Sequence, residues 1–332
     1  MDNSSFTFLG DSPRGLNTMV GMNSVYTTTI TREARRRGIG IEVIDSDTPI
    51  FVLKHKGRRV RCYNSLTDRV GAVTFHMTQN KRLANGFLKS NGFPVPDQER
   101  FTDRDMAERF LARHGSIVVK PCSQWGGRGV SVAVRSPAEL ERAIRFARRF
   151  EEDVILEECV SGVDYRLIFV DFKFVAAIRR RSAHVIGNGR DTIRALIRSR
   201  NRRERRLDPS HVIPVDAETG RNLEALGLSW ETVPEERADV RVRLTSNYHT
   251  GGDVDVVTET VPKPLVSVAR RAVKKLGVPV IGIDFLLDEN TGRYWLIELS
   301  PDLAISPPEG EGVARHFMDY LFPATKKKGT GK

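Results

Sequence analysis

Apolar residues recur at helical or alternating spacing along most of this 332-residue chain, and the period changes several times. Near the start, Ile30 and Ala34 fall on one side of an arginine-rich segment, which predicts a helix ending at Gly38. The alternating residues 39–44 (IGIEVI) then predict a strand. A second amphipathic helix is expected over residues 80–90 and should not continue further, because prolines follow at positions 94 and 96.

The rest of the chain alternates between the two periods. We expect helices at 106–111, 140–147, 191–203 and 264–276, and strands at 116–120, 129–134, 153–157, 165–170, 172–178, 280–288 and 293–299. The turn residues ENTG between the last two strands predict a β-hairpin. The mixture indicates an α/β (α+β) fold, and the polar residues 324–332 predict a disordered tail.

Composition narrows the class of protein. The chain is 39% hydrophobic, enough for a sizeable core, and no run approaches the roughly eighteen apolar residues of a membrane span. Its N-terminus lacks a basic segment followed by an apolar run, so no secretory signal is expected. Cys62, Cys122 and Cys159 are few and far apart, which argues against a disulfide framework or a zinc site and for a cytoplasmic location.

The net charge of +11 indicates an anionic partner. Much of the excess lies in one arginine run, from Arg198 to Arg206, which is explained either by a solvated helix face or by an electropositive wall over an anionic substrate. A nucleic acid is not the expected partner, because the chain has no helix-turn-helix spacing, no Cys/His finger and no aromatic-interleaved RNA signature.

A glycine-rich loop follows the strand that ends at Lys120. Gly126, Gly127 and Gly129 allow the backbone to approach a ligand and to present N–H groups, which together with a nearby ammonium suits a polyphosphate. The spacing matches neither a Walker A motif nor a dinucleotide fingerprint. An ordinary β-turn explains such a loop too.

Acidic residues stand at the end of the next strand, in LEECVSGVDYR (156–166). Backbone groups between Glu157 and Val160 could face an adenine edge, and Asp164 could accept hydrogen bonds from ribose hydroxyls. Solvated acids at a strand end are the alternative explanation.

The hairpin GIDFLLDENTGRYWLIELS carries one acid on each strand, Asp284 and Glu298. They are fourteen positions apart around a turn, so antiparallel pairing can place them side by side. A carboxylate in an apolar strand is costly to bury unless it is paired or bound to a cation, and two adjacent carboxylates repel unless a cation lies between them. Oxygen ligands of this kind suit Mg²⁺. The alternative is two polar positions on an exposed sheet face.

Arginines on the two strands before this hairpin form a further group. Arg166 lies on one strand and Arg179 and Arg180 on the next, so they can share a face and grip a carboxylate or phosphate. Arg243 and Asn247 lie in or beside another glycine-containing turn, SNYHTGGD. Each alone is more often a surface residue.

The order of these features resembles the ATP-grasp superfamily. Five longer segments, TTTITREARRRGI (27–39), FHMTQNKRLANGFLKSNGFPVP (75–96), SAHVIGNGRDTIRALI (182–197), NYHTGGDVDVV (247–257) and FMDYLFP (317–323), are similar to the ATP-grasp module of cyanophycin synthetases and of bifunctional glutathione synthetases. The resemblance implies a small N-terminal α/β lobe (1–76), a central lobe with the glycine loop (77–160), a C-terminal lobe with the metal hairpin (161–323) and the tail (324–332), the two α+β lobes clamping a nucleotide.

It also implies roles for individual residues. The nucleotide contacts would be Lys81 and Lys120 for the phosphates, Ser123 to Gly129 for a mobile loop over them, Glu157, Glu158 and Val160 for the adenine, and Asp164 for the ribose. The other roles would be Asp284, Glu298 and Ser300 for two magnesium ions, which manganese could replace, and Arg166, Arg180, Arg243 and Asn247 for the acyl phosphate or the carboxylate substrate.

Three features depart from the family pattern. Ser300 stands where the family has asparagine, the following PDLAIS lacks the expected Pro-Gly, and the chain has neither the large N-terminal domain nor the Mur-ligase-like module. We therefore expect a free-standing ligase, or one part of a split system, that joins amino-acid or acidic peptide substrates through an acyl phosphate. A homo-oligomer is compatible with this. The alternative is a degenerate ATP-grasp protein that binds a nucleotide or a partner without ligating.

Overall fold

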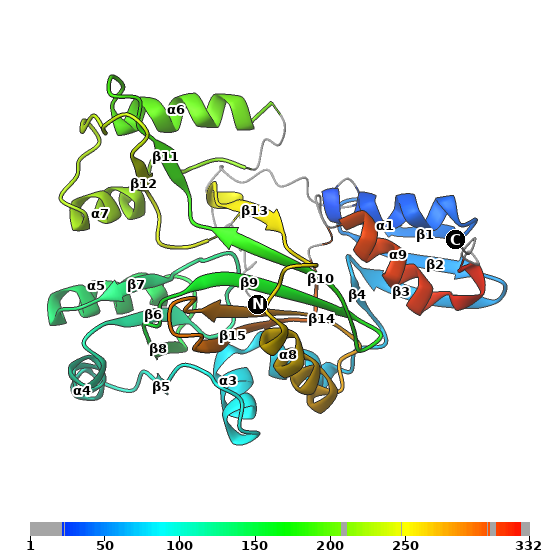
Figure 1. Ribbon diagram of the computed structural model, residues 1–332. Helices are drawn as coiled ribbons and strands as arrows, with labels where there is room; N and C mark the ends of the chain where they lie inside the picture. The colour runs from blue at the N-terminus through cyan, green and yellow to red at the C-terminus, as the bar shows by residue number, and fades with distance from the viewer. Residues whose placement is uncertain are drawn as a thin grey trace, which may run out of the picture.

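The N-terminal sheet has one face covered by helices from both ends of the sequence. The computed structural model describes residues 22, 24–206, 211–246, 248–303, 305 and 310–326. In it, the antiparallel order β1-β2-β3-β4 is built from β1 (Gly40–Asp45), β2 (Ile50–His55), β3 (Arg58–Tyr63) and β4 (Leu66–Thr67). Helices α1 (Val25–Arg36) and α9 (Gly310–Leu321) pack against it side by side (Figure 1). Ile30 and Phe51 share a core with Phe317 of α9.

A second antiparallel sheet carries the glycine loop. Its order is β5-β8-β6-β7, from β5 (Gln98–Arg100), β8 (Val154–Glu158), β6 (Ile117–Pro121) and β7 (Ser131–Val134). Helices α4 (Arg104–His114) and α5 (Pro137–Arg148) contribute to its core, with Phe110 and Leu140 among the buried residues. A capping box between Ser136 and Glu139 starts α5. The strands predicted on either side of the glycine loop, 116–120 and 129–134, form an antiparallel pair in the structure.

The five-stranded sheet lies at the centre of the molecule (Figure 1). Its antiparallel order is β13-β10-β9-β14-β15, from β13 (Asp253–Val256), β10 (Lys173–Arg181), β9 (Val163–Val170), β14 (Val280–Leu287) and β15 (Tyr294–Ser300). Helices α2 (Ala72–Gln79), α3 (Lys81–Ser90) and α8 (Lys263–Leu276) contact its strands. Ile283 belongs to the core shared with α8, whereas Val280 belongs to the core shared with α1 and α9. Burial on both faces explains the nearly continuous apolar sequence of β14.

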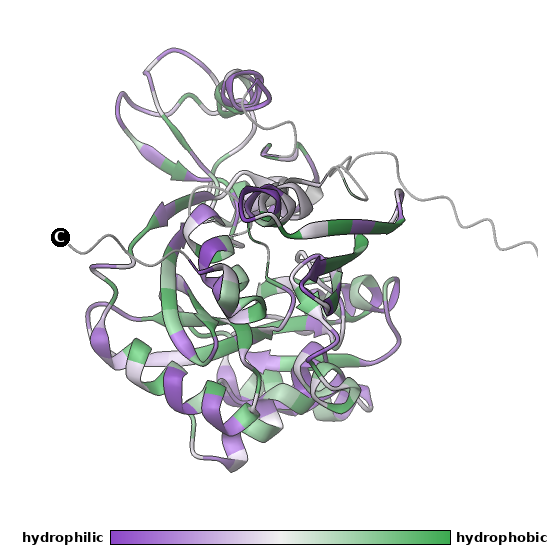
Figure 2. Ribbon diagram, turned by 90° about the vertical axis from the view of Figure 1, so that its right-hand side faces the viewer, coloured by the Kyte–Doolittle hydropathy of each residue, from purple (hydrophilic) through white to green (hydrophobic). Residues whose placement is uncertain are grey.

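A small lobe projects from one side of the molecule (Figures 1 and 2). It contains the two-stranded sheet of β11 (His184–Ile186) and β12 (Asp239–Arg241), and helices α6 (Ile193–Glu204) and α7 (Ala217–Ala225). Ile197 and Leu223 are buried in its own core. We call residues 183–243 the small lobe.

Two short 3-10 helices, η2 (Tyr248–Thr250) and η3 (Pro323–Thr325), complete the elements in the described ranges. Most of the predicted tail, residues 327–332, lies outside the described residues. The predicted domain boundaries at 76/77, 160/161 and 323/324 stay predictions. No helix in the described ranges has the length and apolar character that a membrane span needs.

Candidate active site

Asp284 and Glu298 face each other across the hairpin of β14 and β15. They are direct partners in the antiparallel register, and a register shift follows immediately between Asp284 and Phe285. The predicted side-by-side placement is confirmed. Their surroundings differ, because Asp284 is only 4% exposed whereas the Glu298 side chain is 35% exposed.

Two arginines hold the Asp284 carboxylate. Arg166 on β9 donates from Nε to Oδ1 at 2.6 Å and from Nη2 to Oδ2 at 2.8 Å, and Arg180 on β10 donates to Oδ2 at 2.8 Å. Arg180 also donates twice to Asp164 Oδ1, at 2.7 and 3.0 Å. Arg179 pairs with Asp255 instead, because neighbouring residues of a strand point to opposite faces. The structure thus selects Arg180 as the partner of Arg166.

The charges of this cluster shift its pKa values. Burial raises the pKa of Asp284, but Arg166 and Arg180 outweigh burial and hold it well below the usual range. Burial raises the pKa of Asp164 to about 6, against the opposing effect of Arg180. Asp284 is therefore a carboxylate at neutral pH.

Lys81 connects the hairpin with the glycine loop. At the start of α3, its Nζ lies 3.4 Å from Glu298 Oε1 and donates to the carbonyl oxygen of Gln124 at 2.5 Å. Its backbone N–H donates to the carbonyl oxygen of Cys122 at 2.8 Å. One ammonium thus lies between the two segments predicted to surround the phosphates.

The glycine loop needs its glycines. Gly126, Gly127 and Gly129 all have a φ near +70°, which disfavours side chains. At Gly129 a Cβ would also lie 2.8 Å from Pro121 Cγ, whereas at Gly126 and Gly127 it would meet nothing within 4 Å. The backbone N–H of Ser123 donates to Glu151 at 2.8 Å and fixes the start of the loop.

Lys120 is buried against Glu157. Its Nζ donates to Glu157 Oε1 at 2.7 Å, and Gln98 of β5 donates to Oε2 at 2.8 Å. Beyond this pair, the backbone N–H of Val160 donates to the carbonyl oxygen of Glu158 at 3.1 Å. Two of the backbone groups predicted to face an adenine edge therefore bond to each other in the structure.

Of the remaining predicted residues, Ser300 lies at the edge of the Asp284 cluster and Arg243 belongs to a separate cluster. Arg243 is 3% exposed and donates to Asp216 and Thr219 at 2.9 Å and to Glu218, all at the start of α7. Ser300 Oγ lies 3.5 Å from Arg166 Nη2, at the edge of the cluster. Asn247 lies outside the described residues.

Asp284 and Glu298 could supply two oxygen ligands to a hard divalent cation, which would need further ligands such as water or phosphate oxygens. Asp284 Oδ1 accepts one hydrogen bond in the structure and keeps a second lone pair, and Glu298 is accessible on the next strand. Within the described ranges, no three His, Cys, Asp or Glu residues form a metal-binding group. Mg²⁺ commonly completes such a carboxylate pair with water and phosphate oxygens. Magnesium binding here stays a prediction.

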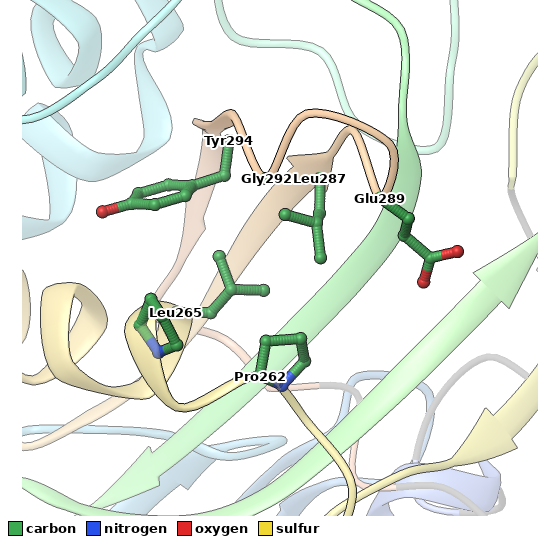
Figure 3. A pocket seen from close by; sticks show the side chains of 7 residues that line it. Pro262, Leu265, Leu287, Glu289, Gly292 and Tyr294 are labelled. Atoms are coloured by element: carbon green, nitrogen blue, oxygen red, sulfur yellow. The ribbon is translucent and has the colours of Figure 1, made fainter.

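A surface pocket of about 340 Å³ lies elsewhere on the same hairpin. Figure 3 shows its lining by Pro262, Leu265, Leu287, Glu289, Gly292 and Tyr294, at the hairpin turn and the start of α8. None of the predicted site residues lines it. Glu289 on its rim accepts a hydrogen bond from Tyr165 at 2.9 Å. It is therefore separate from the arginine–carboxylate cluster.

Two glutamines of the site have contacts that the sequence did not predict. Gln98 orients Glu157 from a three-residue strand too short to show a period. Gln124 contributes a carbonyl oxygen, which carries no side-chain signature. The proximity of Gln124 to three glycines was the one signal for it.

The chain has the ATP-grasp fold, and its sequence is similar to cyanophycin synthetases and bifunctional glutathione biosynthesis proteins. No family model matches it. The crystal structure of a bifunctional glutathione synthetase from Pasteurella multocida has the same fold, with a TM-score of 0.62 and 21% identity over 92% of this chain and 45% of that one.

Among curated relatives, a cyanophycin synthetase of Trichormus variabilis is 30% identical over 317 residues, covering 90% of this chain and 35% of the relative. A bifunctional glutathione biosynthesis protein of Listeria innocua is 28% identical over 341 residues, covering 96% of this chain and 44% of the relative. The chain thus spans less than half the length of these two relatives. Their names agree with the two families that the sequence motifs resemble.

Proposed function

We propose that the protein is an ATP-dependent carboxylate–amine ligase that acts through an acyl phosphate. The observation that carries this is the Asp284–Glu298 pair, with Arg166 and Arg180 converging on one end and Lys81 on the other. Cations and carboxylates of this kind stabilise and position a transferring phosphoryl group. The similarity to two families of synthetases supports the assignment.

In this proposal the predicted central and C-terminal lobes together supply the nucleotide site. Asp284, Glu298 and Ser300 hold magnesium, which would neutralise phosphate charge, with two ions expected and manganese a substitute. Lys81 and Lys120 are assigned to the phosphates, and the loop that contains Ser123, Gly126, Gly127 and Gly129 is assigned to cover them. The adenine is assigned to Glu157, Glu158 and Val160, and the ribose to Asp164.

The proposed reaction has two steps. An oxygen of the substrate carboxylate attacks the γ-phosphorus of ATP, forming an acyl phosphate and releasing ADP. An amine then attacks the acyl carbon, the bond to the phosphate oxygen breaks, and phosphate leaves as the amine loses its proton. Arg166 and Arg180 would balance the developing negative charge, and closure of the glycine loop would keep water from the acyl phosphate.

Three residues need separate treatment. Asp164 could serve a ribose while Arg180 stays bound, because both bonds from Arg180 end on Asp164 Oδ1 and leave Oδ2 for a hydroxyl group. Arg243 donates from Nη1 and Nη2 to two acids of the small lobe, so we assign it a structural role there. Asn247, as the remaining predicted substrate contact, stays a sequence-based prediction.

We expect the substrates to be amino acids or short acidic peptides, because arginines favour carboxylates. The three free cysteines favour a cytoplasmic location. Phosphate release should be screened over pairs of amino acids and acidic peptides with ATP and Mg²⁺, followed by mass spectrometry of the products. Amide formation matched by one phosphate per product supports the proposal; ATP hydrolysis that no amine acceptor accelerates would count against it.

A second candidate is a degenerate nucleotide- or partner-binding protein. Ser300 favours it, because a serine hydroxyl is a weaker metal ligand than the asparagine of the family pattern and lies 3.5 Å from Arg166. Nucleotide binding by calorimetry without turnover of any substrate pair would select this candidate. Ser300→Asn should lower the magnesium concentration needed for half-maximal turnover if the protein is a ligase.

A further inference from the structure

The segment that forms α6 and the two residues after it carries a concentrated positive charge. Residues 193–206 contain seven arginines and one glutamate, a net charge of +6 out of +11 for the whole chain. The helix lies on the outside of the projecting small lobe (Figure 1). Ile193, Ile197 and Asn201 are buried on its inner side.

Three of these arginines form a regular row. Arg198, Arg202 and Arg205 are spaced by four and three residues, so they lie on one face of the helix. All three are exposed, and none has a hydrogen bond or ion pair with a carboxylate among the described residues. We call them the arginine row. Like charges at this spacing destabilise a helix, so the row carries a cost that an anionic ligand would remove.

Other arginines of α6 fix the orientation of the row. Arg200 donates to Asp253 at 2.7 Å and to the carbonyl oxygens of His184 and Gly251 at 2.5 and 2.8 Å. Arg194 lies over the Trp230 ring at 4.9 Å. Asp253 is on β13, opposite Arg181 of β10 and one position from the partner of Arg180. The helix is thus fastened to the edge strand of the sheet that carries the active-site arginines.

We infer that the arginine row binds an extended acidic polypeptide. Along the helix axis, Arg198 and Arg202 are separated by about 6 Å, close to the roughly 7 Å between alternate side chains of an extended peptide. Guanidinium groups bind carboxylates through paired N–H donors. Nucleic acid is less well matched, because single-strand binding combines positive charge with stacking aromatics and Trp230 is already covered by Arg194. The identity of this peptide as the substrate rests on the proposed function.

Binding can be measured directly by fluorescence anisotropy. The probe is a labelled ten-residue peptide of alternating glutamate and serine, and its neutral match has glutamine in place of glutamate. The variant Arg198→Gln/Arg202→Gln/Arg205→Gln should bind the acidic peptide at least tenfold more weakly than the parent and show a flatter salt dependence. The control Arg109→Gln/Arg142→Gln/Arg270→Gln removes the same charge from exposed sites on α4, α5 and α8 and should change affinity less than twofold.

The alternatives have distinct outcomes. Equal weakening by both triple variants, or equal affinity for the glutamate and glutamine peptides, would overturn the inference. A single-stranded DNA decamer that binds more tightly than the peptide and depends on the row would also overturn it, in favour of nucleic acid. Turnover of single amino acids should be unchanged in the row variant. If the parent protein turns over no substrate pair but still binds the acidic peptide through the arginine row, the proposed function is refuted and the inference about the row stands.

Discussion

Asp284 and Glu298 are register partners on adjacent strands, yet two arginines bond to Asp284 whereas Glu298 has one ion pair, with Lys81. The two carboxylates therefore differ in function. Asp284 is bound into the structure of the sheet, whereas Glu298 is the carboxylate that an incoming ligand can reach. Substitutions at the two positions should therefore differ in kind.

Glu298→Ala should abolish ATP turnover, by at least a hundredfold in kcat, and leave the unfolding temperature nearly unchanged. The carboxylate makes one ion pair and is partly exposed, so its loss costs little stability. Phosphate release and thermal unfolding measure the two effects. Glu259→Ala, at an exposed position away from the site, is the matched control. Near-normal turnover would rule out the metal assignment.

Asp284→Asn should lower the free energy of unfolding by about 3–5 kcal/mol, because it leaves the largely buried Arg166 without its charge partner and removes one of the two carboxylates that Arg180 contacts. The pKa of Asp284 is lower in the folded state than the unfolded value of about 3.9. Its contribution is therefore present above that pH and is lost as the pH falls. Urea unfolding between pH 3 and 7 should show that the free energy of unfolding falls less steeply with falling pH in the variant than in the parent. If the free energy of unfolding depends on pH in the same way in both proteins, the loss does not come from Asp284.

Lys81→Met should raise the KM for ATP at least tenfold, since it removes the ammonium that lies between Glu298 and the Gln124 carbonyl. Lys81→Arg should recover part of the loss because it restores the charge. Lys89→Met, on the exposed end of the same helix, is the control. Steady-state kinetics with varied ATP distinguish them, and equal effects at positions 81 and 89 would contradict the role.

Gly129→Ala should impair the glycine loop more than Gly126→Ala. Both residues have positive φ, so alanine costs about 1–2 kcal/mol of backbone energy at either. At Gly129 the added Cβ also collides with Pro121 and Phe150. We expect the KM for ATP to rise at least fivefold more in Gly129→Ala than in Gly126→Ala. Equal KM values for the two variants would contradict the structure of the loop.

Arg243→Gln should act on stability and leave chemistry intact. It removes the cation shared by Asp216 and Glu218, and we expect a loss of about 2–3 kcal/mol. Turnover at a permissive temperature should stay within twofold of the parent. A hundredfold fall in kcat with unchanged unfolding would instead support the substrate-binding role indicated by the sequence.

Periodic segments were predictable because burial imposes the period. The face of α8 that holds Leu265 and Ala272 and the hairpin around the ENTG turn both follow from the sequence and are confirmed. The hairpin of β2 and β3 has a weaker signal, a two-residue turn of Lys56 and Gly57 with positive φ at both. Lys-Gly is an uncommon form of this turn, so the pattern alone did not identify it.

Side-chain partners were the part that sequence could not supply. Whether Arg179 or Arg180 faces Asp284 depends on a one-residue choice of strand register. The pairing of Arg243 with acids of α7 joins residues more than twenty positions apart through the packing of the small lobe. Such contacts depend on tertiary structure, which local periodicity does not encode.

The packing of α1 against α9 has a consequence for how the chain acquires its structure. The core around Ile30 and Phe51 is completed by Phe317 and Met318, nearly three hundred residues later. During synthesis the N-terminal sheet must therefore keep an apolar face open until α9 has left the ribosome. We expect this lobe to be the last to become protected from hydrogen exchange on refolding, because loop closure over so long a separation is slow.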